Sequence, residues 1–370
     1  MWLTMIAALS LAIWLYLLLA RGGFWRMRAD ACTGTPGAPA PSVTAVVPAR
    51  NEADVVGCSM TSLAAQQYAG EFRIILVDDA SEDGTAAIAQ RAAPELRVTA
   101  ARPLRPGWTG KMWAIAEGVR GVTSDYLLLT DADIVHPPEH LAGLVTRAQE
   151  GGYDLVSYMV RLQCGSLAEQ ALIPAFVFFF FLLYPPAWIR DPRHATAGAA
   201  GGCLLIRRAA LERIGGIERI RGELIDDCAL ARAVKESGGD VWLGLSGTAV
   251  SLRQYGTFGE IGQMISRSAY TQLQYSVWLL LGTVVGLAVT YLAPPVLTLA
   301  APRGAAAGMG ALAWLLMTAA YWPAVRYSTR NWFWAPLLPL IALFYLYATL
   351  RSAVAHWRGR GGMWKGRAAG

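Results

Sequence analysis

The hydrophobic positions of this chain form runs of two lengths. Residues 1 to 20 carry no charged side chain. Three more long apolar runs lie at about 277 to 299, 309 to 325 and 333 to 350. Runs of this length are typical of helices that cross a bilayer. Between them, short β-branched runs alternate with stretches of mixed polarity. The pattern therefore predicts an N-terminal membrane anchor (1–22), C-terminal membrane helices (275–350) and a soluble domain between them.

The soluble part alternates strand-like and helix-like segments. The strand-like segments include "VTAVVP" (43–48), "FRIILVDD" (72–79) and "YLLLTDAD" (126–133), with helix-like sequence between them. This alternation predicts an α/β fold with a mostly parallel sheet and helices on both faces. In such sheets, ligands bind at the carboxyl ends of the strands. The small, Pro-rich segment 29–42 has the composition of a linker, which places the domain at 43–270.

One apolar segment, "ALIPAFVFFFFLLYPPAWI" (171–189), interrupts the soluble part. Its uninterrupted portion, residues 171 to 184, would be about 21 Å long as a helix, against about 30 Å for the hydrocarbon core of a bilayer. Prolines at 174, 185 and 186 are expected to break it further. We expect a short interfacial or re-entrant helix, with Phe176 and Phe178 to Phe181 facing acyl chains. A buried helix of the soluble domain is the alternative.

The composition also indicates a membrane protein. Hydrophobic residues make up 55% of the 370 residues, charged residues only 16%, and there are 14 Trp, which exceeds the usual content of soluble domains. The net charge is +6 and is concentrated beside the apolar runs. The basic residues concerned are Arg21, Arg26, Arg28, Arg326, Arg330 and those of a basic tail at 351–370. Their placement favours an anionic membrane leaflet as the partner, and no nucleic acid.

The arginines that follow the first apolar run predict the orientation of the chain. By the positive-inside rule, Arg21, Arg26 and Arg28 place the soluble domain in the cytosol. We therefore expect a multi-pass protein of a bacterial-type cytoplasmic membrane. Three full crossings after the domain would, however, put the basic tail outside. Either the run at 333–350 does not fully cross, or the tail violates the rule, and we favour a cytosolic tail.

Cysteine and histidine show no metal-binding pattern in the sequence. The five cysteines are Cys32, Cys58, Cys164, Cys203 and Cys228. They contain no C-x-x-C pair, which argues against a zinc site and a disulfide framework and fits a reducing compartment. None of the four histidines has a metal-ligand spacing. We expect His136, His140 and His194 to be loop or surface residues.

Pairs of carboxylates follow three predicted strands or loops. These pairs are Asp78 and Asp79, Asp131 and Asp133, and Asp226 and Asp227. Clustered carboxylates disfavour folding unless a cation or a donor-rich ligand occupies the site. Mg²⁺ or Mn²⁺ is usually held by one or two carboxylates together with substrate phosphates, so Asp131-x-Asp133 suits a nucleoside diphosphate. A D-x-D triplet by itself is more often a helix cap or a solvated turn.

The order of the motifs adds to this interpretation. The set comprises "VVPARNE" (46–52), "LVDDASEDGT" (76–85), "GWTGKMWA" (107–114), "LLLTDADIVHPP" (127–138), "AGGCLLIRR" (200–208) and "IDDCALARAV" (225–234). As a set it resembles the family 2 glycosyltransferases, whose nucleotide-sugar-binding domain has the GT-A fold. Within that family, the G-W-T-G-K segment and the flanking apolar helices look most like the hopene-associated and carotenoid glycosyltransferases.

The resemblance implies a donor site for a nucleotide sugar, with a UDP-sugar as the expected donor. The residues that it assigns to donor binding are Pro48, Asn51, Glu52, Asp78, Asp79, Lys111, Asp131, Gly201, Gly202 and Arg267. Lys111 would add its charge to a helix N-terminus beside the diphosphate. Arg267 is assigned through Gln263 and Arg267 in "GQMISRSAY", which is one residue longer than the Q-x-x-R-W motif of the processive members and lacks its Trp. For the other residues, helix capping, solvated positions and simple turns are the alternatives.

The resemblance also implies the chemistry. Asp131 and Asp133 would hold Mg²⁺ or Mn²⁺ against the departing diphosphate. Asp227 would be the general base that removes the acceptor proton, with Asp226 as a catalytic partner or only as the neighbour that shifts its pKa. If segment 171–189 crossed the bilayer fully, Asp133 and Asp227 would lie on opposite sides, so we expect no full crossing. We expect its phenylalanines to guide a lipid towards Asp227.

The sequence therefore predicts an inverting hexosyltransferase that moves a single sugar to a membrane lipid hydroxyl, such as that of a hopanoid or another isoprenoid. A polyprenyl-phosphate glycosyltransferase is one alternative. A non-catalytic membrane scaffold or transporter subunit, in which the acids are structural, is another. A nucleotidyltransferase is disfavoured, because "PARNEADVV" has no glycine before Gly57 and so lacks a Gly-rich phosphate loop.

Overall fold

The computed structural model describes residues 1–300, 304–329, 331–359, 363–364 and 367–368. The chain divides into two compact units. The unit that we call the sheet unit comprises Arg28–Leu162, Trp188–Arg253 and Met363–Gly370, and the helical unit comprises Met1–Met27, Gln163–Ala187 and Gln254–Gly362. Arg330, Arg360 and Lys365, which belong to the basic positions noted in the sequence, lie outside the described residues.

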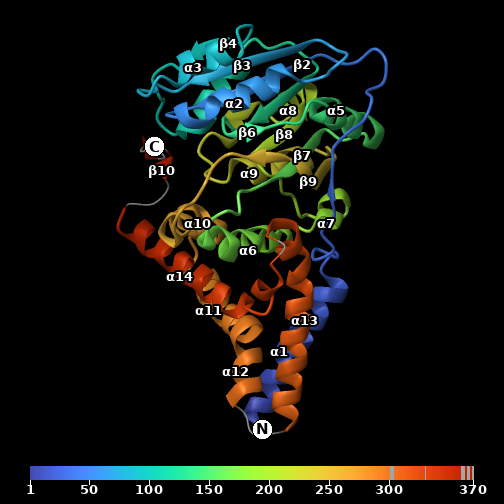
Figure 1. Cartoon of the computed structure of the whole chain (residues 1–370), viewed down its shortest axis with the longest axis vertical. Helices are drawn as coiled ribbons and strands as arrows, with labels where there is room; N and C mark the ends of the chain where they lie inside the picture. The colour runs from blue at the N-terminus through green and yellow to red at the C-terminus, as the bar shows by residue number, and fades with distance from the viewer. Residues whose placement is uncertain (301–303, 330, 360–362, 365–366, 369–370) are drawn as a thin grey trace. The chain divides into compact units, whose positions relative to one another are not determined.

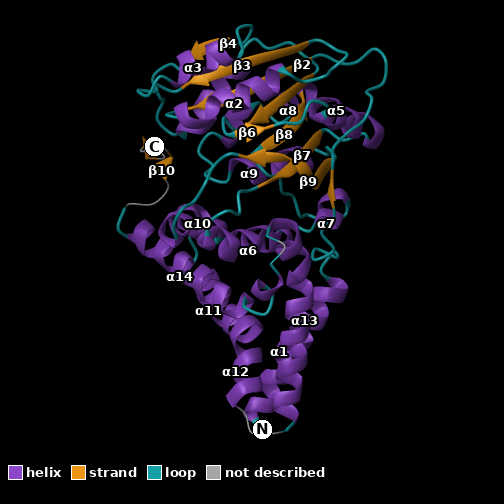
Figure 2. Ribbon diagram, in the orientation of Figure 1, coloured by secondary structure: helices purple, strands orange, loops and turns teal. Residues whose placement is uncertain are grey.

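The sheet unit contains a mixed, mostly parallel sheet (Figure 2). Its strands are β1 (Ala29–Asp30), β2 (Val43–Ala49), β3 (Phe72–Asp78), β4 (Arg97–Ala100), β5 (Tyr126–Thr130), β6 (Ile134–Val135), β7 (Leu155–Arg161), β8 (Cys203–Arg207) and β9 (Val241–Ser251). Among the described residues the strand order is β1-β9-β7-β8-β5-β2-β3-β4, and β6 pairs with β9. Only β8 and β6 run antiparallel to their neighbours. The predicted α/β fold with a mostly parallel, GT-A-type sheet is confirmed.

Helices cover both faces of this sheet, and the central strand β2 shows why. All seven residues of β2 are buried, as expected for a parallel strand with two covered faces. Because side chains alternate along a strand, Ala45 and Val47 join the core that contains Met60 of one helix. Val46 points to the opposite face, where Gly118 lies so close that a Cβ there would be 2.4 Å from a Val46 methyl.

The helices of the sheet unit connect these strands. They are α2 (Ala53–Ala64), α3 (Thr85–Ala92), α4 (Gly110–Val119), α5 (His140–Gly151), α8 (Arg208–Arg213), the 3₁₀ turn η1 (Ile217–Ile220) and α9 (Asp226–Glu236). α7 (Pro186–Arg190) lies at the boundary between the two units. The strands β2, β3 and β5 are parallel, so their carboxyl ends lie at one edge, and the acidic motifs follow those ends.

The helical unit contains helices and short helical turns, several of them long and apolar (Figure 1). They are α1 (Trp2–Ala20), α6 (Leu167–Leu183), α10 (Phe258–Gln272), α11 (Val277–Leu287), η2 (Ala288–Leu292), α12 (Ala293–Ala300), α13 (Ala305–Ser328), η3 (Trp332–Trp334) and α14 (Leu338–Trp357). α11, η2 and α12 form one continuous apolar stretch, with a π-helical turn just before Pro294 and Pro295. Prolines lack the N–H that an α-helix needs, and a π-turn adjusts for it.

Five helical segments of the described chain are long and apolar enough to cross a bilayer: Trp2–Ala20, Leu167–Arg190, Val277–Ala300, Ala305–Ser328 and Leu338–Trp357. Length and composition alone support this statement. α1 packs against α13, and the Trp14 indole N–H donates to the carbonyl of Thr290 at 2.8 Å. The number of full crossings and the side of the basic tail stay predictions.

The Phe-rich helix α6 differs from expectation in two respects. It does not break at Pro174 but continues for 17 residues, about 25 Å at 1.5 Å per residue. Phe178 and Phe181 are buried, and the ring of Phe178 packs against those of Phe24 and Tyr321. The expectation that the whole run faces acyl chains is therefore wrong for these two residues, because neighbouring helices of the unit cover one side of α6. Within the unit, α6 runs across the direction of α1 and α13 (Figure 1).

Candidate active site

A single cavity in the sheet unit gathers residues from five of the predicted motifs. It is lined by Pro48, Lys111, Met112, Ile115, Leu129, Thr130, Asp131, Gly201, Leu204, Ile217, Ile220, Asp226, Asp227 and Leu230. One wall is apolar, and the polar groups come from the ends of β2 and β5, the start of α4, the segment before β8 and the start of α9. Six of the predicted site residues therefore line one cavity. The cavity follows the carboxyl ends of the strands, as the fold predicts.

Lys111 lies between the two acidic motifs. It is the second residue of α4, which begins after the N-cap Thr109. Its Nζ lies 3.0 Å from Asp131 Oδ1 and 3.2 Å from Asp226 Oδ2. Burial works against its charge, but the carboxylates of Asp131, Asp226 and Asp227 together raise the pKa of Lys111 above its ordinary value. Asp131 and Asp226, which are 95 positions apart in sequence, thus share one ammonium group.

Asp227 is held by backbone N–H groups. Gly201 donates to its Oδ2 and Cys228 to its Oδ1, each at 2.7 Å. Burial, with a further contribution from the Asp226 carboxylate, raises the pKa of Asp227 to about 6. A carboxylate with this pKa is ionised at neutral pH and still basic enough to accept a proton.

Gly201 permits this contact. A Cβ at residue 201 would lie 3.3 Å from both Asp227 Oδ2 and Lys111 Nζ, and its φ is not in the left-handed region. The glycine is needed for close approach and not for a turn. Gly202 instead packs against Val160 and Ile134, whose side chains a Cβ there would meet at 3.1 and 3.4 Å. Of the two roles left open for these glycines, close approach therefore fits Gly201, whereas Gly202 contacts apolar core.

Asp133, the second acid of the D-x-D triplet, is buried in a different set of contacts. Its Oδ2 accepts a hydrogen bond from Ser251 Oγ at 2.8 Å and lies 3.4 Å from Arg253 Nε. Arg253 also donates to both Glu52 oxygens at 2.8 Å. Burial, and then the Asp131 charge, raise the pKa of Asp133, and Arg253 and Ser251 oppose this. No role was predicted for Ser251 or Arg253 from the sequence. The available signal was their position at the end of a strand, here β9.

The acids of the cavity fit a divalent cation. Around Lys111, three carboxylates and one ammonium leave two negative charges in a partly buried space. A divalent ion bound with a diphosphate would meet Asp131, which is 37% exposed, and Asp226, which is 20% exposed. Oxygen donors of this kind are those that Mg²⁺ and Mn²⁺ prefer. Asp133 supplies a further carboxylate, close enough for the Asp131 charge to contribute to its raised pKa.

The other predicted donor residues belong to two interlocked loops after β2 and β3. Asn51, at φ +51°, donates its N–H to Ser81 Oγ and accepts from the Glu82 N–H through its side chain. The Glu52 N–H donates to Thr85 Oγ1 at 2.8 Å. Pro48 lines the cavity. The structure therefore places these residues beside one another at the strand ends, with the side chain of Asn51 engaged in joining the loops.

The remaining predicted residues lie elsewhere. Asp78 ends β3 and is partly exposed, whereas the side chain of Asp79 is only 2% exposed and pairs with Arg50. Arg267 lies on α10 in the helical unit, and it is not among the residues that line the cavity.

The prediction that the histidines are loop or surface residues is wrong for His140, which is buried at the start of α5, whereas His136 lies in the loop after β6 but is buried there. His136 and His140 are 3% and 1% exposed, because the turn after β6 and the start of α5 are packed against the core of the sheet. His136 contacts Thr130, and the ring of His140 contacts that of Tyr158. His194 is exposed and stacks on Trp188.

Comparisons with known proteins agree with this geometry. Residues 44–215 match the family described as glycosyl transferase family 2. An undecaprenyl-phosphate 4-deoxy-4-formamido-L-arabinose transferase of Serratia proteamaculans (strain 568) is 34% identical over 120 residues, which are 32% of this chain and 36% of the relative. The match thus spans about a third of that relative's length. A mannosyltransferase from Pyrobaculum calidifontis, solved with GDP-Man and Mn²⁺, has a similar fold with a TM-score of 0.60 and 19% identity, covering 95% of this chain and 98% of that chain.

Residues 44–215 therefore match a family 2 glycosyltransferase domain, and the fold is of the GT-A type. The predicted resemblance is confirmed at the level of the family.

Proposed function

We propose that this chain is a membrane-bound, metal-dependent glycosyltransferase that moves one sugar, with inversion, from a nucleoside diphosphate donor to a lipid. The observation that carries the proposal is the convergence of Asp131, Asp226 and Asp227 on the Lys111 ammonium in one cavity. A membrane scaffold has no need for three carboxylates around one buried cation, because such clusters cost stability unless a ligand compensates them.

The donor diphosphate is assigned to the Lys111 side of the cavity. Lys111 and the N-terminus of α4 supply positive charge there. Asp131 and Asp133 would hold Mg²⁺ or Mn²⁺, which neutralises charge on the leaving diphosphate when bound. Pro48, Asn51, Glu52, Asp78 and Asp79 lie on the loops that would hold the base and ribose, and a UDP-sugar is the donor that we propose. The Mn²⁺ and GDP-Man named for the Pyrobaculum enzyme support a divalent ion and a nucleotide sugar of some kind.

Asp227 is assigned as the general base. It takes the proton of the acceptor hydroxyl while the hydroxyl oxygen forms a bond to the anomeric carbon. The bond from that carbon to the diphosphate breaks on the opposite face, so the configuration inverts. The hydrogen bonds from Gly201 and Cys228 fix the carboxylate, and its pKa of about 6 suits proton transfer near neutral pH.

The acceptor is a membrane lipid, and two chemical classes compete. A hopanoid or other isoprenoid hydroxyl needs a base, whereas a polyprenyl phosphate is already ionised and needs none. The base geometry at Asp227 favours the hydroxyl. The name of the Serratia relative, which acts on undecaprenyl phosphate, favours the phosphate. We propose a catalytic domain on the cytosolic side of a bacterial-type membrane, anchored by α1 and the C-terminal helices, with α6 as an interfacial or re-entrant segment that guides the lipid.

Donor binding is the sharpest test of the proposal. UDP with Mn²⁺ should raise the melting temperature of the full chain in detergent. When the free ligand is at a hundred times its Kd, the expected stabilisation is about 2.7 kcal/mol. Asp131→Asn should abolish the shift, while Glu236→Gln, an exposed acid on α9, should retain it. If UDP, GDP and their sugar derivatives all leave the wild-type melting temperature unchanged with Mg²⁺ and with Mn²⁺, the proposed enzyme function is contradicted and a non-catalytic scaffold is favoured.

A further inference from the structure

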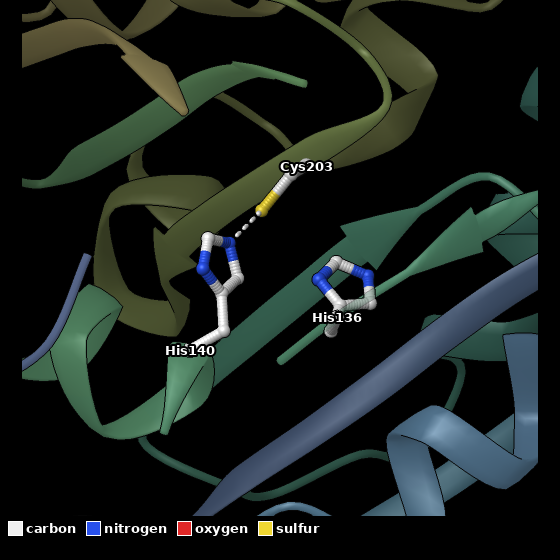
Figure 3. A group of neighbouring side chains, drawn as sticks. All are labelled: His136, His140 and Cys203. Atoms are coloured by element: carbon white, nitrogen blue, oxygen red, sulfur yellow. Dashed lines mark hydrogen bonds between the residues drawn. The ribbon is translucent and has the colours of Figure 1, made fainter. Parts of the chain in front are cut away.

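A second group of metal-binding side chains lies inside the sheet unit, apart from the cavity. It consists of His136 after β6, His140 at the start of α5 and Cys203 at the start of β8 (Figure 3). One ligand atom from each residue lies within 4.8 Å of the others. The three residues are 3%, 1% and 0% exposed, and none of them lines the candidate active site.

The hydrogen bonds of Thr130 fix the state of His136. The Thr130 hydroxyl donates its single proton to the carbonyl of Gly202 at 2.7 Å. It must therefore accept from His136 Nε2, which lies 2.9 Å away. The proton of the neutral ring is on Nε2, so Nδ1 carries a bare lone pair. This Nδ1 is buried and has no hydrogen-bond partner within the described part of the chain.

An imidazole held in this way resembles a metal ligand. Metal-bound histidines typically donate their other N–H to an oxygen, which fixes the tautomer and the ring orientation. Thr130 performs that function for His136, and Thr130 is itself oriented by Gly202. A lone pair buried without a donor is unfavourable, and a bound cation would satisfy it.

His140 and Cys203 supply the other two donors. His140 Nε2 lies 3.4 Å from Cys203 Sγ (Figure 3). Two ligands at the usual zinc distances, about 2.0 Å for nitrogen and 2.3 Å for sulfur in a tetrahedral arrangement, would be about 3.5 Å apart. The rings of His136 and His140 have centroids 5.2 Å apart. These positions allow one ion to contact all three side chains after small side-chain movements.

We propose that His136, His140 and Cys203 bind one thiophilic d¹⁰ metal ion, Zn²⁺ or Cu⁺, in a structural site. On binding, the Cys203 thiol loses its proton to solvent and the thiolate sulfur coordinates the ion, while both imidazoles stay neutral. Two imidazoles and one thiolate suit soft or borderline ions and not Mg²⁺ or Mn²⁺. With Cu⁺ the buried group is neutral, and with Zn²⁺ it carries one positive charge.

The site would join two segments of the candidate active site to α5. Thr130 directly precedes Asp131, and Gly202 lies between Gly201 and Cys203. The metal would therefore fix the D-x-D loop and the glycine pair to the first turn of α5. The inference does not depend on the proposed transfer reaction, because it concerns a separate set of ligands.

Metal content of the full chain in detergent tests the proposal. After chelator treatment, the wild type should take up one equivalent of Zn²⁺ or of Cu⁺ per chain, measured by elemental analysis and by competition with a chromophoric chelator. Addition of Co²⁺ should give a thiolate-to-cobalt charge-transfer absorption. Cys203→Ser should lose the absorption and the tight equivalent. Cys58→Ser, which changes an exposed cysteine, and Asp131→Asn, which changes the acidic site, should keep both.

The outcomes separate clearly. Uptake of Zn²⁺ alone or of Cu⁺ alone supports the site and identifies the ion. Wild-type protein that takes up neither ion, or that binds Co²⁺ without thiolate absorption, overturns the proposal even if the variants fail to fold. Loss of binding in Asp131→Asn but not in Cys203→Ser would overturn it as well, since the ion would then belong to the acidic cavity.

Discussion

The backbone N–H of Gly201 donates to Asp227 Oδ2 at 2.7 Å, and no Cβ stands between this amide and the carboxylate. The amide and the carboxylate come from segments 26 residues apart, the one before β8 and the one that begins α9. Together they determine where the candidate base points.

Gly201→Ala should reduce turnover more than stability. The added methyl would lie 3.3 Å from Asp227 Oδ2 and Lys111 Nζ, so both charged groups must shift by a few tenths of an ångström. We expect kcat to fall about tenfold, since larger misplacements of about 1 Å cost about a hundredfold. Gly202→Ala is the matched control, because its methyl meets only apolar side chains. This variant should have a lower Tm, while its kcat should change little. Equal effects of the two variants on kcat would contradict this account.

Asp227→Asn should separate the two acceptor classes. With a lipid hydroxyl as acceptor, the variant should keep the UDP and Mn²⁺ melting shift and lose about 10²- to 10⁴-fold in transfer, the usual contribution of a general base. With a polyprenyl phosphate as acceptor, transfer should persist. Radiolabelled sugar transfer into vesicles that contain one acceptor or the other gives the answer, with Glu236→Gln as the control on the same helix. A fully active variant on a hydroxyl lipid removes the base assignment.

The pH dependence follows from the raised pKa of Asp227, which burial sets at about 6. The unfolded chain, with an Asp pKa near 3.8, binds this proton less tightly than the folded protein. The group therefore favours the folded state fully below about pH 3.8 and loses that contribution as the pH rises through about 6. Activity needs the ionised form, so kcat/KM for a hydroxyl acceptor should rise through about pH 6. Residual activity of Asp227→Asn should lack that step.

Arg253→Met should destabilise the sheet unit. The change removes the cation shared by Glu52 and the buried Asp133. Exposed pairs contribute up to about 1 kcal/mol, whereas breaking a buried pair costs about 3 to 5 kcal/mol; Arg253 is 36% exposed, so we expect a loss between these limits. Chemical unfolding in detergent measures it. Arg193→Met, which breaks a pair whose arginine is 88% exposed, should leave stability nearly unchanged, because solvent screens exposed pairs.

The sequence predicted those parts of the site that depend on strand ends. Parallel strands bring their carboxyl ends to one edge, so Pro48 and Asp131 were expected near one another, and both line the cavity. Lys111 and Asp227 joined them through the family resemblance. Contacts between distant segments were not accessible in this way. Arg253 and Glu52 are 201 positions apart, and no local pattern relates them.

Burial was also difficult to predict where periodicity gave no direction. The helix α6 is apolar on all sides, so its sequence does not indicate which phenylalanines face protein, and Phe178 and Phe181 proved buried. His140 and Cys203 are 63 positions apart, and only the pairing of β5 with β8 brings the start of β8 towards the residues that follow β5.

The place of β8 in the sheet has a consequence for biosynthesis. β8 lies between β5 and β7, but both of those strands leave the ribosome before α6, and β8 leaves after it. During translation, β5 and β7 must therefore remain apart until the hydrophobic helix has been made and β8 can pair with both. Because nascent domains usually fold as each becomes complete, synthesis of α6 would precede closure of the sheet, and the strand ends that line the cavity would take their final places only after this apolar helix has been made.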